Sequence, residues 1–279
     1  MESGSRGVSH VGHRRSLSTT LTLVDNGLAE SDLAAAVVRS GPWTSVTVVP
    51  QTGSTNHDLA AAARAGERDG AVLVAAEQTA GRGRLARAWS SPPGTSLSIS
   101  YLLRPPRSDI GLLPLVTGLG VARGLGRLGL DARLKWPNDV LVGGLKVCGI
   151  LAEIVLTDAT PAVVVGMGVN VSQTTEQLPV PWATSLALAG AGVSRTEAAI
   201  AVLTGVGEAV QQWAAGGWDA VGTPYAERCA TLGREVRVEL SETDHVHGTA
   251  VGVSREGRLQ VRVGTEVREY AAGDVHHLR

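Results

Sequence analysis

An arginine-rich loop constrains this chain more than any other stretch. Residues 78–107 hold five arginines and no carboxylate, and three of those arginines fall in the glycine-containing stretch GRGRLAR at 81–87. A folded loop holds that much like charge together when an anionic group neutralises it, and arginine favours forked recognition of carboxylate or phosphate oxygens. Trp89 adds a flat face on which a ring can stack. The loop alone also fits a solvated basic segment, so other parts of the sequence must decide.

The composition excludes several classes of protein. With 279 residues and a net charge of −1, the chain is neither a nucleic-acid coat nor a membrane-surface binder, because its basic character is local. Its two cysteines, Cys148 and Cys229, are far apart, which excludes a disulfide framework and a cysteine-rich metal site and fits a reducing, cytoplasmic location. No apolar run approaches the roughly 20 residues that span a bilayer. Phenylalanine is absent, so we expect a core of aliphatic side chains and a few tryptophans.

The distribution of polar and apolar residues divides the chain into three predicted parts. Residues 1–42 are mostly polar, and we expect a flexible tail and a short helix at 30–39 capped by Ser31. This piece is too short for a winged helix-turn-helix domain, so we expect no specific nucleic-acid partner. Residues 43–232 form the predicted main domain. From residue 233 the pattern changes to short alternating strands, which predicts a small β domain over 233–279.

The main domain is predicted to alternate strands with helices. Residues 95–103 alternate apolar residues with serines, which predicts a half-buried strand with a polar face. The sequence GLGRLG at 124–129 matches the dinucleotide fingerprint, but it falls at the end of a predicted helix, so it does not indicate a Rossmann fold. The other predicted elements are strands at 47–49, 71–76, 140–142, 145–155 and 161–171, and helices at 57–65, 109–128, 194–215 and 224–232, and in the β domain strands at 235–240, 247–253, 259–263 and 266–270.

Two further motifs stand where a ligand could bind. GSTN at 53–56 lies at a strand-to-helix junction, where its polar side chains either cap the helix or hold a polar ligand group. Lys146 begins an apolar strand after KWPND at 135–139, and it either extends its ammonium to solvent or meets an anion in a site. The glycines of GMGVN at 166–170 could admit a ligand close to the backbone.

Taken together, these segments resemble the bacterial biotin protein ligases (biotin–[acetyl-CoA-carboxylase] ligases) of the type without a DNA-binding domain. The matching blocks are GSTN at 53–56, QTAGRGRLARAW at 78–89, KWPND at 135–139, KVCGILAE at 146–153 and GMGVN at 166–170. They occur in the family's order and spacing, and the similarity runs from about Trp43 to the C-terminus. Ala86 stands where the family usually has glycine, which implies a less mobile loop.

The resemblance implies an α+β fold, in which a class II synthetase-like mixed sheet with helices on one side precedes a small SH3-like β-barrel. It also implies that biotin and MgATP react to give biotinyl-5′-AMP, and that a lysine of a biotin carboxyl carrier protein, part of a biotin-dependent carboxylase, then accepts the biotin. Mg²⁺ would arrive with ATP, because the sequence shows no closed protein cage for it.

Site residues carry over from the matched motifs. The resemblance gives catalytic roles to Lys146 and Arg84. It gives biotin binding to Ser54, Thr55, Asn56, Gln78, Gly81, Arg82, Gly83, Arg84, Lys146 and Gly149. It gives nucleotide binding to Arg84, Arg87, Trp89, Lys135, Asn138, Asp139 and Asn170.

Two alternatives remain at this point. Lipoate ligases and octanoyltransferases resemble this family in their fold and in the active-site lysine. The GRGR loop and the KWPND segment favour biotin as the substrate. A nucleic-acid-binding module using the arginine loop would need several aromatic residues near the basic ones, and only Trp89 and Tyr101 are near.

Overall fold

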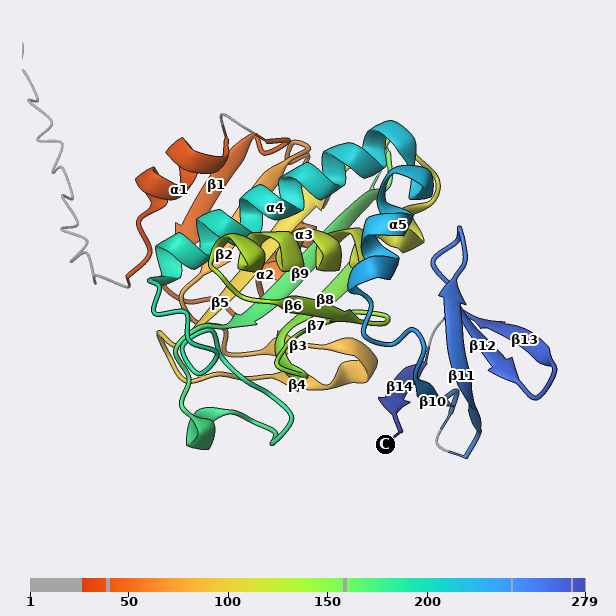
Figure 1. Cartoon of the computed structure of the whole chain (residues 1–279). Helices are drawn as coiled ribbons and strands as arrows, with labels where there is room; N and C mark the ends of the chain where they lie inside the picture. Colours follow the sequence, from red (N-terminus) through yellow and green to blue (C-terminus); the bar gives the residue numbers. More distant parts are fainter. Residues whose placement is uncertain (1–26, 39–40, 158–159, 242, 272, 279) are drawn as a thin grey trace, which may run out of the picture.

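The computed structural model describes residues 27–38, 41–157, 160–241, 243–271 and 273–278, and it contains two large β-sheets (Figure 1). The first has seven strands in the order β1-β2-β5-β9-β8-β7-β6. β1 and β2 are parallel and the remaining neighbours are antiparallel, so the sheet is mixed, as expected. In that order the strands are Ser45–Val49, Ala71–Ala75, Ser96–Leu103, Ala162–Asn170, Leu145–Val155, Asp139–Val142 and Ala132–Lys135.

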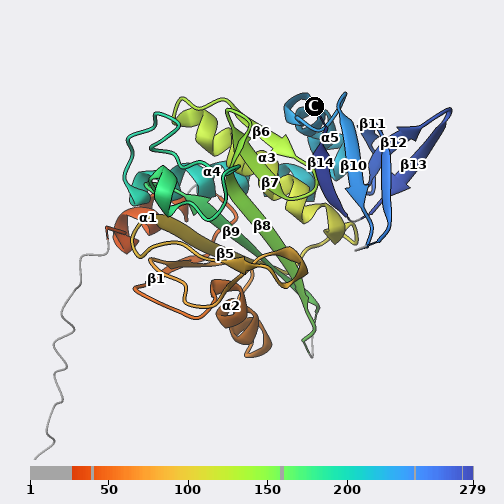
Figure 2. The same ribbon diagram turned by 90° about the horizontal axis from the view of Figure 1, so that it is seen from below.

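Helices cover both faces of this sheet, not one as the resemblance implied. Figure 2 shows α1, α3 and α4 on one side of the sheet and α2 on the other. Two separate apolar clusters fill the two interfaces, and the one beneath α2 contains Leu59, Leu102 and Val164. The α-helices are α1 Glu30–Val37, α2 Thr55–Arg64, α3 Leu113–Arg127, α4 Arg195–Gly216 and α5 Trp218–Arg228.

The position of α2 corrects the prediction for β5. All eight residues of β5 are buried, so its serine face is not exposed to solvent. Ser100 is fully buried, and its hydroxyl contacts Thr55 and Asn56 at the start of α2. Alternation identifies the two faces of a strand, but it does not reveal whether a polar face meets water or other polar side chains.

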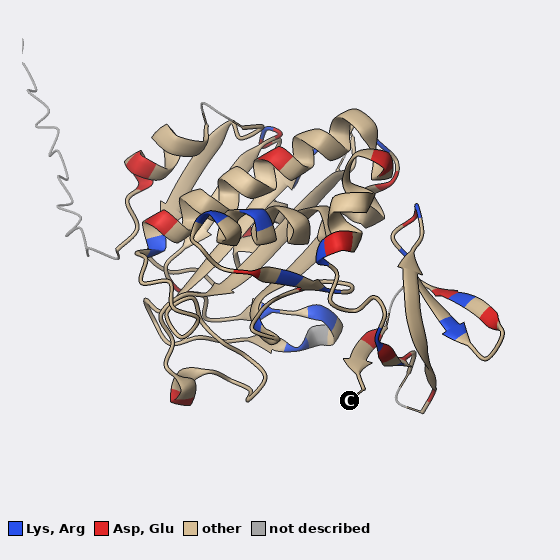
Figure 3. Cartoon of the chain, viewed as in Figure 1, with Lys and Arg blue, Asp and Glu red and all other residues tan. Residues whose placement is uncertain are grey.

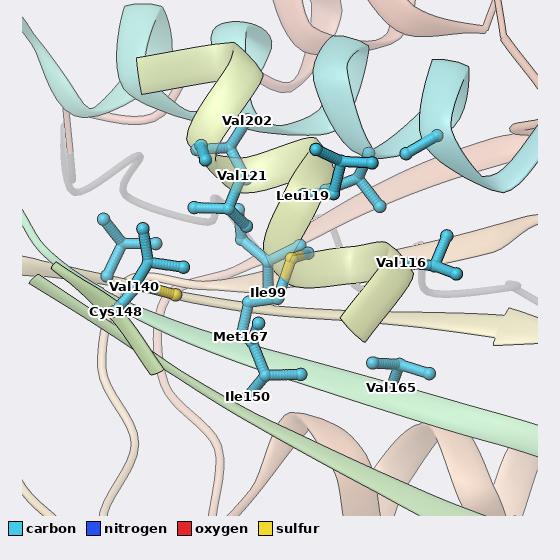
Figure 4. Close-up of a cluster of buried hydrophobic side chains, with 14 of the residues drawn as sticks. Ile99, Val116, Leu119, Val121, Val140, Cys148, Ile150, Val165, Met167 and Val202 are labelled. Carbon is cyan, nitrogen blue, oxygen red and sulfur yellow. The ribbon is translucent and has the colours of Figure 1, made fainter. Parts of the chain in front are cut away.

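Aliphatic side chains fill the core, as the composition led us to expect. In Figure 4, Ile99, Ile150 and Met167 from the sheet lie against side chains of α3, which include Val116, Leu119 and Val121. The apolar face of α3 therefore packs across the central strands.

Glycines let α3 approach α4 closely. A Cβ atom on Gly120 would lie 2.4 Å from Val206 Cα, and one on Gly124 would lie 2.4 Å from the carbonyl oxygen of Ala201. The GLGRLG motif lies at the end of α3, as predicted, and its Gly124 serves helix packing.

Several element boundaries differ from the predictions. α1 begins after Ala29, so Ser31 lies inside the helix rather than capping it, and the predicted tail at 1–20 lies outside the described residues. α5 spans Trp218–Arg228 and not the predicted 224–232, so it begins six residues before Pro224, which lies inside it. The capping box of Ser194 and Glu197 is confirmed at the start of α4. The short 3₁₀ turns are η1 Arg84–Ala86, η2 Ile110–Leu112 and η3 Thr175–Gln177.

The second large sheet is antiparallel and has the order β13-β12-β11-β10-β14. Its strands are β10 Glu235–Glu239, β11 His245–Val253, β12 Leu259–Val263, β13 Glu266–Tyr270 and β14 Asp274–His277. The sequence predicted the first four of these and missed β14, because Val275 is the only apolar residue in it. In the described chain, no helix is both long and apolar enough to cross a membrane.

Candidate active site

A cavity of about 650 Å³ opens between the seven-stranded sheet, the arginine-rich loop and β14. Fifteen of the sixteen site residues named from the sequence line it. They are Ser54, Thr55, Asn56, Gln78, Arg82, Gly83, Arg84, Arg87, Trp89, Lys135, Asn138, Asp139, Lys146, Gly149 and Asn170. The sixteenth, Gly81, lets β3 (Gly81–Arg82) pair closely with β4 (Ala88–Trp89), because a Cβ there would lie 2.5 Å from the carbonyl oxygen of Trp89.

One end of the cavity is polar and uncharged, and it is built around the start of α2. Ser54 caps the helix, since its Oγ accepts a hydrogen bond from the His57 amide at 3.4 Å. Thr55 presents its amide and its hydroxyl to Gln78 Oε1, at 2.8 and 2.9 Å. Capping and ligand binding therefore do not compete in GSTN, because one residue caps while its neighbour faces the cavity.

The arginine-rich loop covers the other end. It is folded as β3, η1 and β4, and Figure 3 shows its basic residues gathered beside the sheet. Arg84 donates to Asn138 Oδ1 at 3.0 Å and to the carbonyl oxygen of Gly273 at 3.4 Å. Arg87 forms an ion pair with Asp274, which also lies 4.0 Å from Arg84. Internal groups therefore already engage two of the three loop arginines, which the sequence analysis did not foresee.

Trp89 lies flat against a part of the sheet that has no side chains. A Cβ on Gly168 would lie 2.3 Å from the indole ring, and one on Gly149 would lie 3.1 Å from it. The indole Nε1 is buried and has no hydrogen-bond partner among the described residues. The two glycines, one on β8 and one on β9, thus make room for a flat group at the floor of the cavity.

Lys146 points into the cavity and not to solvent. Its Nζ lies 2.6 Å from Asp139 Oδ1 and 5.8 Å from the centre of the Trp89 ring. A second ammonium, that of Lys135, stands nearby, and burial is the main cause that lowers its pKa, while Asp139 opposes that shift and Lys146 adds to it. Two lysines and three arginines therefore line a cavity that can hold a strongly anionic group.

The two asparagines assigned to the nucleotide side are committed to internal hydrogen bonds. Asn138 Nδ2 donates to the Ile150 carbonyl at 2.9 Å, and its oxygen accepts from Arg84. Asn170 donates to the Thr184 carbonyl at 2.9 Å and accepts from Gln173 at 3.1 Å. Both side chains fix the walls of the cavity, which is a role that the sequence alone did not reveal.

Comparisons with known proteins agree with this geometry. The Biotin/lipoate A/B protein ligase family matches residues 48–170, and the Biotin protein ligase C terminal domain matches residues 231–278. The biotin–[acetyl-CoA-carboxylase] ligase of Mycobacterium tuberculosis is 39% identical over 262 residues, which cover 90% of this chain and 96% of that protein. The chain belongs to the biotin protein ligase family.

Two other relatives of this ligase support the assignment. The bifunctional ligase/repressor BirA of Escherichia coli is 31% identical over 244 residues, which cover 83% of this chain and 73% of that protein. The structure of the biotin protein ligase from Aquifex aeolicus in complex with biotin and ATP superposes with a TM-score of 0.73 at 30% identity, covering 85% of this chain and all of that one.

The sequence analysis missed the residues that line the cavity from β14, which are Asp274, His276 and His277. Gly168, one of the GMGVN glycines expected to admit a ligand, lies at the floor of the cavity. His277 Nε2 lies 3.1 Å from the hydroxyl of Thr231. The same hydroxyl accepts a hydrogen bond from the Trp136 amide, so its contact with His277 ties β14 to the KWPND segment. Only the tertiary structure reveals this, since β14 lies more than 130 residues from KWPND.

Proposed function

We propose that this chain activates biotin with ATP to biotinyl-5′-AMP and transfers the biotinyl group to a lysine of a biotin carboxyl carrier protein. The observation that carries the proposal is the division of the cavity, in which a neutral polar end around Thr55 and Gln78 faces a cationic end around Lys146 and Arg84. Biotin has the same division, with a ureido ring at one end and a carboxylate at the other.

The polar end also separates biotin from the acyl chains that lipoate and octanoate ligases use. Thr55 and Gln78 place hydrogen-bonding atoms at this end of the cavity, and an aliphatic chain or a dithiolane ring has no N–H or carbonyl group to meet them. Such unpaired groups make a site reject a ligand that lacks the matching hydrogen-bonding atoms.

The cationic end serves the activation step. A carboxylate oxygen of biotin attacks the α-phosphorus of ATP, and pyrophosphate leaves with the electrons of the broken bond. The two reacting anions repel each other in water, and Lys146 and Arg84 stabilise the charge that develops between them. In the second step the amine of the carrier lysine attacks the activated carbonyl, and AMP leaves. We assign no covalent enzyme intermediate.

Trp89 and the nucleotide side complete the proposal. The indole ring over Gly149 and Gly168 forms an apolar wall for the biotin chain, and its exposed edge is the candidate surface for the adenine. Lys135, Asn138, Asp139 and Asn170 line the side of the cavity where the phosphates and ribose would lie. Ser54, Arg82 and Gly83 line the biotin side.

Mg²⁺ fits this site as a companion of ATP. No cluster of three or more histidine, cysteine, aspartate or glutamate side chains placed to hold a metal occurs in the described part of the chain. Asp139 and Asp274 line the cavity, and each is paired with a basic side chain. We propose that ATP phosphates and water supply most of the ligands, with Asp139 as the candidate protein ligand.

The setting of the reaction is also proposed. Both cysteines are buried and free, which supports a reducing cytoplasmic location, where a biotin-dependent carboxylase would supply the carrier domain. Tyr101, one of the two aromatic residues that a nucleic-acid-binding module would need, is fully buried beside Trp43 and cannot stack on a base.

Isotope exchange between ATP and pyrophosphate tests the activation step. We expect exchange that requires biotin and is not supported by lipoate or octanoate. Transfer is then followed as labelled biotin on a carrier domain, with a carrier whose target lysine is replaced by arginine as the control. Exchange that proceeds equally with lipoate, or that never depends on biotin, would overturn the proposal.

A further inference from the structure

The transfer step needs a group that takes a proton at the open side of the cavity. The ammonium of a lysine side chain has a pKa of about 10.4, so at neutral pH the carrier lysine arrives protonated and without a lone pair. That lysine is attached to a protein domain and can approach only from solvent. The group that receives its proton must therefore both line the cavity and be exposed.

The described lining of the cavity has few candidates for this group. Apart from the lysines, which are assigned to the anionic groups of the substrates, four side chains can accept a proton, namely Asp139, Asp274, His276 and His277. Asp139 is paired with Lys146 at 2.6 Å, and Asp274 is paired with Arg87. Burial lowers the pKa of His277 to about 4, so its ring holds a proton too weakly near neutral pH. His276 remains, and 55% of its side chain is exposed.

The strand β14 places His276 beside the reacting groups. His276 and Asp274 are two residues apart on this strand, so their side chains share one face at a spacing of about 7 Å. Asp274 meets Arg84 and Arg87, which the proposed function assigns to the nucleotide. His276 therefore lies next to the place that the proposed function gives to the mixed anhydride of biotin and AMP.

A carboxylate orients the imidazole of His276. Its Nε2 lies 3.4 Å from Glu239 Oε2 on β10, and Arg237 holds the other oxygen of Glu239 at 2.8 Å. β10 and β14 are antiparallel neighbours, with Arg237 opposite His276. When the Nε2 proton faces Glu239, Nδ1 carries the lone pair that can accept a proton. The carboxylate also stabilises the imidazolium that then forms.

We infer that His276 is a catalytic residue of the transfer step, in which it takes a proton from the acceptor lysine, and that Glu239 positions it. The inference rests on the proposed function and deepens it. The ammonium proton passes to Nδ1 of the imidazole, and the freed amine attacks the carbonyl carbon of biotinyl-5′-AMP. The bond from that carbon to the phosphate oxygen breaks, and its electrons leave with AMP. The second surplus proton of the nitrogen and the proton on the imidazole pass to water.

A split between the two steps of the reaction tests this role. In His276→Gln an amide replaces the ring and cannot take the proton. Single-turnover transfer from enzyme-bound biotinyl-5′-AMP to the carrier domain should slow by about 10²-fold, at the low end of what a general base contributes. Formation of biotinyl-5′-AMP from biotin and ATP releases no lysine proton, so its rate should stay near that of the wild type. A merely structural role at the cavity would change both rates.

A nucleophile that needs no base separates proton transfer from positioning. Hydroxylamine is largely unprotonated at neutral pH, and it reacts with biotinyl-5′-AMP to give a hydroxamate. With enzyme in excess over the adenylate, His276→Gln should form the hydroxamate as fast as the wild type while it transfers biotin slowly to the carrier. In His276→Ala, added imidazole should restore part of the transfer rate, because it can take the proton in place of the missing ring.

Two further variants test the positioning and the specificity of the effect. Glu239→Gln should slow transfer by up to about fivefold, because partly exposed ion pairs contribute little, and it should add nothing in the His276→Gln background. His247→Gln is the matched control and should keep both rates. His247 is exposed and lies opposite Arg237 on the same sheet, but it does not line the cavity.

Three results would overturn the inference. They are transfer at the wild-type rate in His276→Gln, an equal slowing of its hydroxamate reaction, and an equal slowing of transfer in His247→Gln. A wild type that forms no biotinyl-5′-AMP is a separate outcome, because it would overturn the proposed function and this inference with it.

Discussion

Lys146 and Gly149 lie three residues apart on β8 and nevertheless line the same cavity. In a regular strand, residues three apart point to opposite faces. Here the pairing between β7 and β8 shifts, so that Leu141 pairs with Lys146 while Val140 pairs with Cys148. This β-bulge turns Lys146 to the face of Gly149, and a Cβ on Gly149 would lie 3.1 Å from Lys146 Nζ. The bulge thus aims the ammonium over the floor of the cavity.

The first prediction concerns that ammonium. Lys146→Ala should lower the rate of adenylate formation by about 10²–10³, because it removes a preorganised positive charge from the point where charge develops. The measurement is single-turnover formation of biotinyl-5′-AMP, with thermal unfolding as the control for folding. A variant with nearly normal rates would show that the pair of Lys146 and Asp139 is structural.

The bulge also marks what the sequence could and could not predict. Most strands of the two large sheets, and α2, α3 and α4, follow from hydrophobic period, glycine turns and caps, since each depends on local chemistry. The sequence did not predict β6 and β14. Only the resemblance to a family predicted that segments far apart in the chain form one site. The bulge at Lys146 has no sequence signature, because Gly143 and Gly144 predict a hairpin but not its register.

Other features depend on tertiary contacts alone. The serine face of β5 is buried only because α2 covers it and Asn56 of α2 contacts Ser100. The residues next to Ser100 in the sequence do not indicate that contact. Asp274 meets the arginine-rich loop from a strand with too few apolar residues to be recognised.

The second prediction concerns DNA. The segment 1–42 is short and mostly polar. Because residues 1–26 lie outside the described part of the chain, the prediction about DNA binding rests on the sequence. We expect no sequence-specific operator binding with or without biotin. Mobility shift with a promoter fragment and a scrambled fragment of equal length, at physiological salt, checks this. Tight retention of the promoter fragment alone, dependent on biotin, would contradict it.

The third prediction concerns pH and His277. Burial lowers the pKa of His277 from 6.5 to about 4, and the positive charges of Lys135, Arg234 and His276 act in the same direction. Between pH 6.5 and 4 the unfolded chain therefore binds more protons at this residue than the folded chain does. The contribution of His277 to stability is present above pH 6.5 and is lost as the pH falls through this window.

Replacing the imidazole tests that sign. His277→Gln keeps a side chain that can hydrogen-bond with the Thr231 hydroxyl but does not titrate, so its free energy of unfolding should fall less steeply with acidification between pH 6.5 and 4. Urea unfolding at several pH values gives the slope. His57→Gln, a change at an exposed helix position, is the matched control and should keep the wild-type slope. Equal slopes for the wild type and His277→Gln would contradict the prediction.

The last prediction concerns the arginine-rich loop and its tie to the C-terminal sheet. Without ligand, residues 81–88 are held by the pairing of β3 with β4 and by Arg84 and Arg87 against Gly273 and Asp274. Asp274→Asn weakens the attraction to both arginines, so protease cleavage within residues 81–88 should become faster in the ligand-free protein. Biotin and ATP should slow cleavage in both proteins, because the adenylate supplies a phosphate on which the arginines converge. Asp219→Asn, which removes an exposed ion pair with Arg255 elsewhere, is the control.

The same loop should retain the activated intermediate. Arg84→Gly removes the side chain that links the loop to Asn138 and Gly273, and it adds a residue with greater backbone freedom. We expect biotinyl-5′-AMP to escape and to acylate lysines of bystander proteins in solution. Labelling of an unrelated lysine-rich protein is the measurement, with Arg68→Gly as the comparison, because Arg68 is exposed and does not line the cavity. If ligand leaves cleavage unchanged and bystander labelling equals that of the wild type, the loop does not close over the adenylate.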